Sequence, residues 1–136
     1  MLVRYQTEFS AAHRLMREDW SATRNQEVFG PCARGHGHNY GLEVTIEGPV
    51  MEECGMVMNF NDLEAHVKTR LLDHVDHRDL DKDVPFLNGI LSTAENLLKA
   101  FWNPLATGLP EGVRLHALSL RETRDFTCTY YGPDDA

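Results

Sequence analysis

The stretch His36–Glu47, HGHNYGLEVTIE, decides the fold because it reads as one long β-strand that opens with two histidines. Successive side chains of a strand point to opposite faces of a sheet. One parity combines both histidines with apolar side chains: His36, His38, Tyr40, Leu42, Val44 and Ile46. Buried imidazoles are costly unless their nitrogens have partners, and a divalent metal ion binds them well. The stretch therefore predicts an enzyme with a metal site; the alternative is two core histidines bonded to backbone carbonyls.

A second strand provides a third candidate ligand. Residues Leu2–Phe9 alternate between apolar and polar side chains, and His13 continues the buried parity. A catalytic zinc site keeps three protein ligands and leaves one coordination position open. We therefore expect His13 to join His36 and His38 in binding zinc.

Helical patterns occupy the middle of the chain. The expected elements after the second strand are helices over Asp62–Leu72 and from Ala94 to Leu105, then strands over Val113–Glu122 and Phe126–Tyr131. Each helix follows a capping box, Asn61 with Glu64 and Ser92 with Glu95. The charged segment Met16–Pro31 is expected to be a loop between the first two strands.

The order of these elements, ββααββ, predicts the fold class. Runs of strands separated from a run of helices are typical of α+β domains. We expect a four-stranded antiparallel sheet with two helices packed on one face. At 136 residues, a single domain over residues 1–136 is the natural reading.

Composition narrows the class of protein. The net charge of −8, without clusters of Lys or Arg, argues against a nucleic acid or an anionic membrane as partner. Charge within the first few residues, without a long apolar segment, predicts neither a secretion signal nor a membrane span. Three scattered cysteines suit free thiols in a reducing compartment. These features predict a cytoplasmic protein.

Cys32 is the candidate catalytic thiol. It follows the turn formers Gly30 and Pro31, and Arg34 is close in sequence. A nearby cation and a partly exposed loop favour the thiolate, which acts as a base or a nucleophile. The alternative is a small buried hydrophobic residue.

Two Asp-His pairs lie just past the first helix, Asp73-His74 and Asp76-His77. An aspartate can fix the tautomer of an imidazole and raise its basicity, so either pair could exchange a proton with Cys32. Spacing alone does not choose between the pairs, and a solvated, charge-rich loop is the alternative.

Glu122 shares the parity of Leu118 and Leu120, which predicts a carboxylate on the apolar side at the end of a strand. A buried carboxylate needs donors, and a ligand with two adjacent N–H groups would supply them. The alternative is a glutamate that reaches solvent.

Motifs along nearly the whole chain resemble one known family. They are Phe9-Ser10-Ala11-Ala12-His13-Arg14-Leu15, Cys32 followed by His36-Gly37-His38-Asn39-Tyr40, Gly55-Met56-Val57-Met58-Asn59-Phe60, Asp76-His77-Arg78-Asp79-Leu80-Asp81, Val84-Pro85-Phe86, Ser92-Thr93-Ala94-Glu95-Asn96, and Glu122. Their order resembles that of the 6-pyruvoyl-tetrahydropterin synthases and the related 6-carboxytetrahydropterin synthases of queuosine biosynthesis.

The resemblance implies a tunnelling fold whose trimers close a shared barrel and stack into a hexamer. It also implies site roles. By this resemblance His13, His36 and His38 are zinc ligands, Cys32 removes a proton from carbon, and Asp76 with His77 relays it. Glu122 is implied as the anchor of the amino-pyrimidinone edge of the pterin, and Thr93 as a further pterin contact. The continuation Arg78-Asp79-Leu80 favours Asp76-His77 over the other pair.

The substrate implied by the resemblance is 7,8-dihydroneopterin triphosphate. Only Ala33-Arg34-Gly35 separates Cys32 from His36, and this short spacing resembles the carboxy-forming branch. We therefore expect 6-carboxy-5,6,7,8-tetrahydropterin as the product, with release of acetaldehyde. The alternatives are a pyruvoyl-forming synthase, and a relative that binds zinc and pterin without turnover or only cleaves a neopterin. The sequence does not assign the basic residues that bind the triphosphate.

Overall fold

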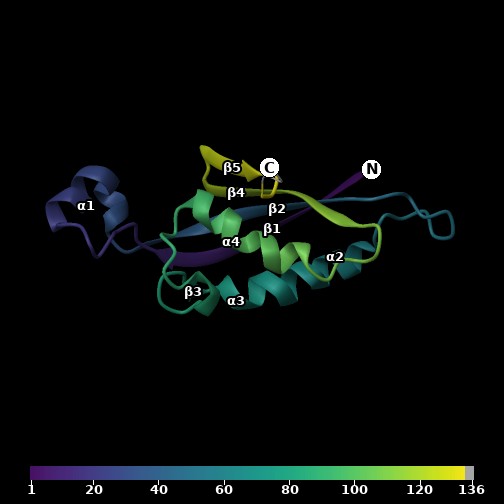
Figure 1. Cartoon of the computed structure of the whole chain (residues 1–136), viewed down its shortest axis with the longest axis horizontal. Helices are drawn as coiled ribbons and strands as arrows, with labels where there is room; N and C mark the ends of the chain where they lie inside the picture. Colours follow the sequence, from purple (N-terminus) through teal and green to yellow (C-terminus); the bar gives the residue numbers. More distant parts are fainter. Residues whose placement is uncertain (134–136) are drawn as a thin grey trace.

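The computed structural model describes residues 1–133; residues 134–136 of the expected domain lie outside the described part. One sheet has the strand order β3-β1-β2-β4-β5. The strands are Leu2–His13 (β1), His36–Glu47 (β2), Arg78–Asp79 (β3), Arg114–Thr123 (β4) and Phe126–Tyr130 (β5). The α-helices are Ala22–Phe29 (α1), Phe60–Val67 (α2), Asp73–Val75 (α3) and Ala94–Ala106 (α4). Helices α2, α3 and α4 lie on one side of the sheet (Figure 1), so the expected α+β class is confirmed.

Strands β1 and β2 form the central antiparallel pair. Their register runs without a break from Leu2 opposite Glu47 to His13 opposite His36. The predicted parity is confirmed, because the side chains that alternate inward from both strands line the core. Within it, the rings of Phe9 and Tyr40 stack with centroids 4.9 Å apart. This register places the histidine end of β1 beside the histidine end of β2.

The sheet has one strand more than the four expected. Strand β3 has only two residues and pairs in parallel with Ala11 and Ala12 of β1. The His77 N–H donates to the Ser10 carbonyl at 2.6 Å, and the Leu80 N–H donates to the Ala12 carbonyl at 2.8 Å. A two-residue strand shows no alternation, so the sequence pattern could not reveal it.

The expected loop over Met16–Pro31 was wrong, because most of it is helix α1 followed by a 3₁₀ turn over Gly30–Ala33. Ser21 caps the helix by accepting a hydrogen bond from the Arg24 N–H at 3.1 Å. Helix α1 lies apart from the main body at one end of the molecule (Figure 1). Its only buried residue is Asn25, so it lacks the apolar stripe that predicts a helix.

The first expected helix begins earlier than predicted and is not regular. Its cap is Asn59, which accepts from the Asn61 N–H at 2.8 Å, so the capping box at Asn61 was wrong. A π-helical stretch, Lys68–Leu72, separates α2 from α3. The buried residues of the whole segment recur every four positions: Leu63, Val67, Leu71 and Val75. On an α-helix this spacing drifts by roughly 40° per step, and the wider π turn compensates for the drift.

Helix α4 confirms the second expected helix, and its buried residues lie on one face: Ala94, Leu97, Leu98, Phe101 and Leu105. Its cap is Thr93, which accepts from the Asn96 N–H at 3.2 Å, so the capping role assigned to Ser92 was wrong. Ser92 is 1% exposed and turns toward β1 instead. No helix in residues 1–133 is long and apolar enough to cross a membrane.

Candidate active site

The ends of β1 and β2 bring His13, His36 and His38 together. Each residue offers one ring nitrogen, and these three nitrogens lie within 4.8 Å of one another, close enough to share a metal ion. The ring centroid of His13 lies 4.6 Å from that of His36 and 5.1 Å from that of His38. His13 is buried and the other two are half-buried. The strand register alone therefore builds a group of three imidazoles.

Backbone carbonyls fix the tautomers of two of these rings. His13 Nδ1 lies 2.9 Å from the Ser92 carbonyl oxygen, and His36 Nδ1 lies 2.6 Å from the Arg34 carbonyl oxygen. A carbonyl oxygen can only accept, so each Nδ1 has the proton. Each Nε2 is therefore unprotonated and has a lone pair, which is the form in which imidazole binds a metal ion.

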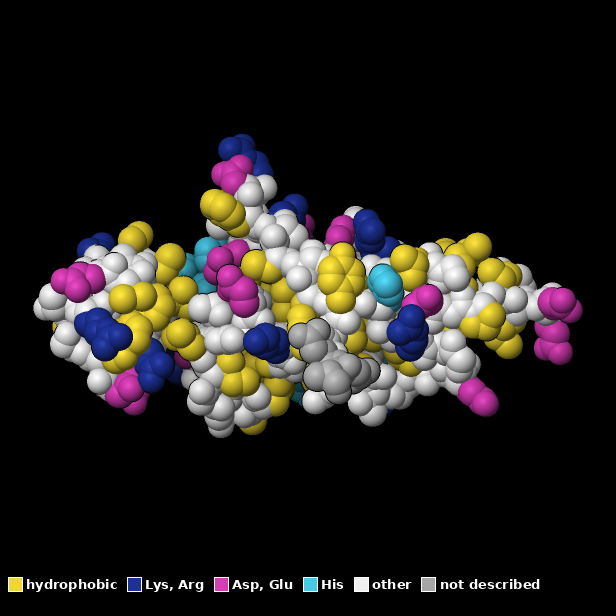
Figure 2. Space-filling model, turned by 45° about the horizontal axis from the view of Figure 1, so that its top comes forward, with side chains coloured by type: hydrophobic (Ala, Val, Ile, Leu, Met, Phe, Trp, Pro, Cys, Tyr) yellow, Lys and Arg dark blue, Asp and Glu magenta, His cyan; other side chains and the backbone are white. Residues whose placement is uncertain are grey.

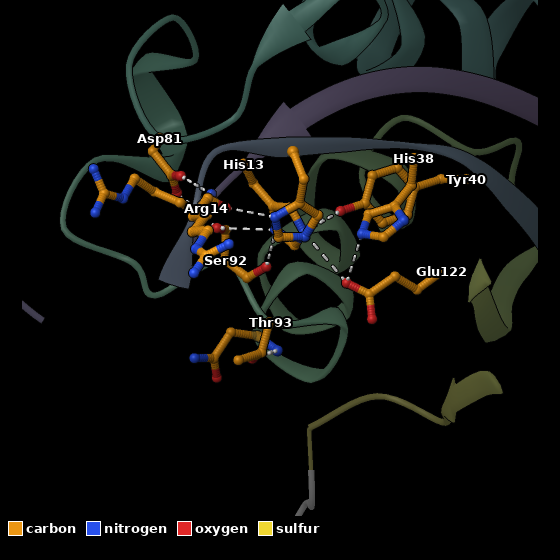
Figure 3. A network of polar contacts seen from close by, with 11 residues as sticks. His13, Arg14, His38, Tyr40, Asp81, Ser92, Thr93 and Glu122 are labelled. Atoms are coloured by element: carbon orange, nitrogen blue, oxygen red, sulfur yellow. Dashed lines mark hydrogen bonds and ion pairs between the residues drawn. The ribbon is translucent and has the colours of Figure 1, made fainter. Parts of the chain in front are cut away.

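The third ring has a nitrogen without a partner. His38 Nε2 is buried and makes no hydrogen bond within the described residues. The nearest acidic oxygen, Glu122 Oε1, lies 3.5 Å from it and 3.4 Å from His13 Nε2. A buried polar atom without a partner is rare, and an ion bound here would satisfy it. These residues therefore fit a metal ion (Figure 3).

The electrostatics of the cluster favour neutral rings. Burial lowers the pKa of His13 below its ordinary value of 6.5, and the hydrogen bond to the Ser92 carbonyl opposes this shift. Burial also lowers the pKa of His38, and the Glu122 carboxylate opposes that shift. Burial raises the pKa of Tyr40, so its hydroxyl stays protonated and can donate to His13 Nε2 at 3.3 Å. Proton loss from His13 and His38 therefore does not limit metal binding near neutral pH.

Glu122 reaches the histidines from β4. It lies at an irregularity in the pairing of β4 with β5, between Arg121 and Thr123. Such a bulge redirects a side chain and is common beside functional sites. The Glu122 side chain is 28% exposed, so one part faces the cluster and another part remains open to a ligand. Histidine side chains, in cyan, also reach the surface of the molecule (Figure 2).

The predicted relay residues lie at the surface just before β3. Asp76 Oδ1 lies 2.9 Å from His77 Nδ1 and also accepts from the Ser10 N–H at 2.9 Å. The His77 side chain is 82% exposed, and its backbone has a φ of 60°, an uncommon conformation for a residue with a β-carbon. By contrast Asp73 pairs with Lys68, and no hydrogen bond joins it to His74 within residues 1–133. Only the second Asp-His pair is therefore in contact.

Cys32 is exposed at the end of the 3₁₀ turn. Within the described residues no hydrogen bond or ion pair joins it to Asp76 or His77, so the structure does not bring the predicted thiol and its relay together. Thr93, the further pterin contact implied by the resemblance, uses its hydroxyl to cap α4.

Sequence reasoning missed three residues around His13: Ser92 and Tyr40 contact its ring, and Asp81 bonds to Ser92. All three belong to motifs that carry the resemblance, but none was given a role at the site. The parity of Tyr40 with the histidines was the available signal. No pattern connects Asp81 and Ser92 to His13, because they meet only in the folded chain.

Comparisons with known proteins identify the family of this chain. The family model described as 6-pyruvoyl tetrahydropterin synthase matches residues 2–133. The chain belongs to the 6-pyruvoyl tetrahydropterin synthase family. A relative from Dictyostelium discoideum, named 6-pyruvoyl tetrahydrobiopterin synthase, is 40% identical over 124 residues, which are 91% of this chain and 90% of the relative. The expectation of an enzyme of this family is confirmed.

A solved member of the 6-pyruvoyl tetrahydropterin synthase family confirms the fold. The structure of the Caenorhabditis elegans 6-pyruvoyl tetrahydropterin synthase has a TM-score of 0.89 and 37% sequence identity. The match covers 98% of this chain and 96% of the other. The expected tunnelling fold therefore holds, with five strands in the described chain.

The expected carboxy-forming branch, and with it the queuosine pathway, was wrong. An archaeal relative from Archaeoglobus fulgidus, named putative 6-carboxy-5,6,7,8-tetrahydropterin synthase, is only 30% identical over 125 residues, 92% of this chain and 90% of the relative. Relatives near 40% identity have the pyruvoyl name. The expectation relied on the three residues between Cys32 and His36. Loop length varies among homologues without changing the scaffold, so it does not report on the product.

Proposed function

We propose that this protein converts 7,8-dihydroneopterin triphosphate to 6-pyruvoyl-tetrahydropterin, with loss of triphosphate and with zinc as its metal ion. One observation supports this most directly: three imidazoles converge beside the Glu122 carboxylate in a chain 40% identical to a 6-pyruvoyl tetrahydrobiopterin synthase. The geometry suits a substrate that offers hydroxyl groups to a metal ion and N–H groups to a carboxylate.

His13, His36 and His38 would hold the zinc ion. Zinc, when bound, supplies Lewis-acid chemistry that acidifies the side-chain hydroxyls of the substrate. Glu122 has one oxygen near two histidines and remains 28% exposed, which supports its role as the pterin anchor. Its carboxylate would accept hydrogen bonds from the adjacent N–H groups of the amino-pyrimidinone ring, and this pairing orients the pterin.

Cys32 is proposed to remove the proton from the substrate carbon, with Asp76 and His77 as relay. A carboxylate accepts, so the 2.9 Å contact assigns the proton to His77 Nδ1 and leaves Nε2 basic. The Asp76 charge then stabilises the imidazolium that forms after proton transfer. The Asp76 oxygen is itself held by the Ser10 N–H, which fixes the pair against β1.

The active unit is proposed to be an oligomer in the cytoplasm, a hexamer built from two trimers as the resemblance implies. Two features of residues 1–133 support assembly. Strand β1 pairs with β3 only at Ala11 and Ala12, and β5 pairs only with β4, so both sides of the sheet have open edges. Open edges favour pairing with another chain. Light scattering coupled to gel filtration measures the mass directly.

The test of function is incubation with dihydroneopterin triphosphate and zinc, followed by identification of the products by mass spectrometry. We expect 6-pyruvoyl-tetrahydropterin and free triphosphate. Protein treated with a chelator, and the Cys32→Ala variant, are the matched controls and should give no product above background. Acetaldehyde among the products, or unchanged substrate with zinc-loaded protein, would contradict the proposal.

A further inference from the structure

A polar chain leads from the surface loop after β3 to the buried ligand His13. Asp81 Oδ1 lies 2.6 Å from Ser92 Oγ, and Ser92 Oγ lies 3.3 Å from His13 Nδ1. The other Asp81 oxygen accepts from the Arg14 N–H at 2.8 Å. Figure 3 shows Asp81 and Ser92 on the side of the His13 ring opposite Glu122.

The direction of each hydrogen bond follows from the chemistry of the groups. A carboxylate only accepts, so the Ser92 hydroxyl proton points to Asp81. The free lone pairs of the hydroxyl oxygen then face the Nδ1–H of His13, as does the Ser92 carbonyl at 2.9 Å. Without Asp81, the hydroxyl could rotate and present its proton to Nδ1, where it would favour the tautomer that cannot bind a metal through Nε2.

We propose that Ser92 and Asp81 are positioning residues for the metal ion. Ser92 holds His13 in the Nδ1–H tautomer with Nε2 toward the ion, and Asp81 acts through Ser92 by fixing its hydroxyl as an acceptor. This inference rests on the proposed metal site and adds to it a dependence of ion affinity on two residues that do not touch the ion. The outer partners of a ligating histidine fix its orientation and raise its basicity.

His13, on β1, differs in this respect from His36, on β2. His36 Nδ1 is held by the Arg34 carbonyl, which is two residues away in the same chain segment. His13 instead depends on two residues far away in sequence: Asp81, in the loop after β3, and Ser92, just before α4. Ser92 is 1% exposed, so water does not readily replace its hydroxyl. The packing of two distant segments therefore sets the geometry of the most buried ligand.

The experiment measures the affinity of the full chain for Zn²⁺ by competition with a chromogenic chelator. The variants are Ser92→Ala, Asp81→Asn and the double variant. The matched controls are Ser119→Ala, which removes a hydroxyl paired with Thr129, and Asp19→Asn, which breaks an exposed pair with Arg17. We expect each site variant to bind zinc about 10- to 100-fold more weakly, and the controls to bind like wild type. The double variant should be no weaker than Ser92→Ala alone, because Asp81 acts through the hydroxyl.

Two further readouts separate positioning from a general loss of structure. The absorption bands of the Co²⁺-loaded protein should shift in the site variants and not in the controls. Denaturant unfolding of the metal-free proteins should show a stability change too small to account for the lost affinity. Unchanged zinc affinity in both single variants would overturn the inference while leaving the metal site intact, as would affinity losses matched by lost stability. Wild-type protein that binds no zinc would overturn the metal site itself, and the inference with it.

Discussion

His13 is 2% exposed and has partners on both ring nitrogens, whereas the side chain of His77 in the other half of the candidate site is 82% exposed. The first half comprises the three histidines and Glu122, held by the register of β1, β2 and β4. The second half comprises Cys32 and the Asp76-His77 pair, which lie on surface turns. We call these groups the buried half and the exposed half. One chain brings the buried half together, whereas within residues 1–133 no hydrogen bond or ion pair joins Cys32 to the pair in the exposed half.

This difference separates two kinds of substitution. Changes to the buried half alter metal affinity and the stability of the fold together, because a buried group without its partner is costly. Changes to the exposed half alter the reaction with little effect on stability, because exposed side chains contribute little to folding. The predictions below test this division, starting with the largest expected effect.

Removing one ligand from the buried half should abolish metal binding. His36→Ala leaves two imidazoles, which are too few for the three-ligand site that catalytic zinc requires. We expect no stoichiometric zinc by elemental analysis and no turnover. The control is His74→Ala, which belongs to neither half and should keep wild-type zinc content. Full zinc content in His36→Ala would show that the three imidazoles do not act as one site.

Removing the thiol from the exposed half should abolish turnover without loss of metal. Cys32→Ala should lower kcat by about 100- to 10,000-fold, the range for loss of a general base. Zinc content and the denaturation midpoint should match wild type, because Cys32 is exposed. A variant with a near-normal rate would remove the thiol from the mechanism.

The relay pair can be tested without disturbing the backbone. His77 has a φ of 60°, and asparagine tolerates this conformation better than most residues, so His77→Asn removes the imidazole with little strain. We expect kcat to fall by about 100-fold, with a changed pH profile. A matching fall in His74→Asn, with His77→Asn unaffected, would assign the relay to the other pair.

Glu122 is the member of the buried half that we propose to bind the pterin and not the metal ion. Glu122→Gln keeps the shape and loses the charge, and a hydrogen bond to a charged group contributes about 1.5–3 kcal/mol. We expect KM to rise tenfold or more while zinc content remains stoichiometric. Loss of zinc in this variant would instead make the carboxylate a metal ligand.

The smallest effect concerns pH. Burial lowers the pKa of His13 and His38 below 6.5, so the unfolded chain binds protons that the folded chain does not. The metal-free protein should therefore be fully stable above pH 6.5 and lose stability as the pH falls, by at most about 1.4 kcal/mol per pH unit for each ring. Urea unfolding at pH 8 and pH 5.5 measures this loss. Equal stability at both values would show that the two rings take up protons freely in the folded state.

Alternation in the sequence predicted most of the buried half. The parity of β1 and β2 placed the three histidines on one face, and the parity of Leu118, Leu120 and Glu122 placed the carboxylate beside them. Such patterns succeed because a side-chain period of two leaves only two choices of face. The irregular pairing of β4 with β5 at Glu122 leaves no such pattern in the sequence and was not predictable.

Local signals failed where two residues compete for one role. Asn59 and Asn61 both suit a helix cap, as do Ser92 and Thr93. In the second case the Ser92 hydroxyl contacts Asp81 and His13 instead, which leaves the cap to Thr93. Helix α1 was missed because it buries almost no apolar surface, and its order depends on Ser21 and on the stacking of Trp20 with Phe29. The product branch was misjudged because a loop length was given chemical meaning.

The π-helical stretch Lys68–Leu72 contains one residue more than a regular helix needs between Val67 and Val75. Deleting one residue there would shorten one four-residue step to three, and on a regular α-helix three residues fall short of a full turn by roughly 60° where four exceed it by roughly 40°. Leu63, Val67 and Val75 would then stay on one face of a regular helix, and Asp76 would stay near the Ser10 amide. Homologous enzymes are therefore expected to have either the same residue count from Leu63 to Asp76 or one residue fewer, with a regular helix in place of the π-helical stretch.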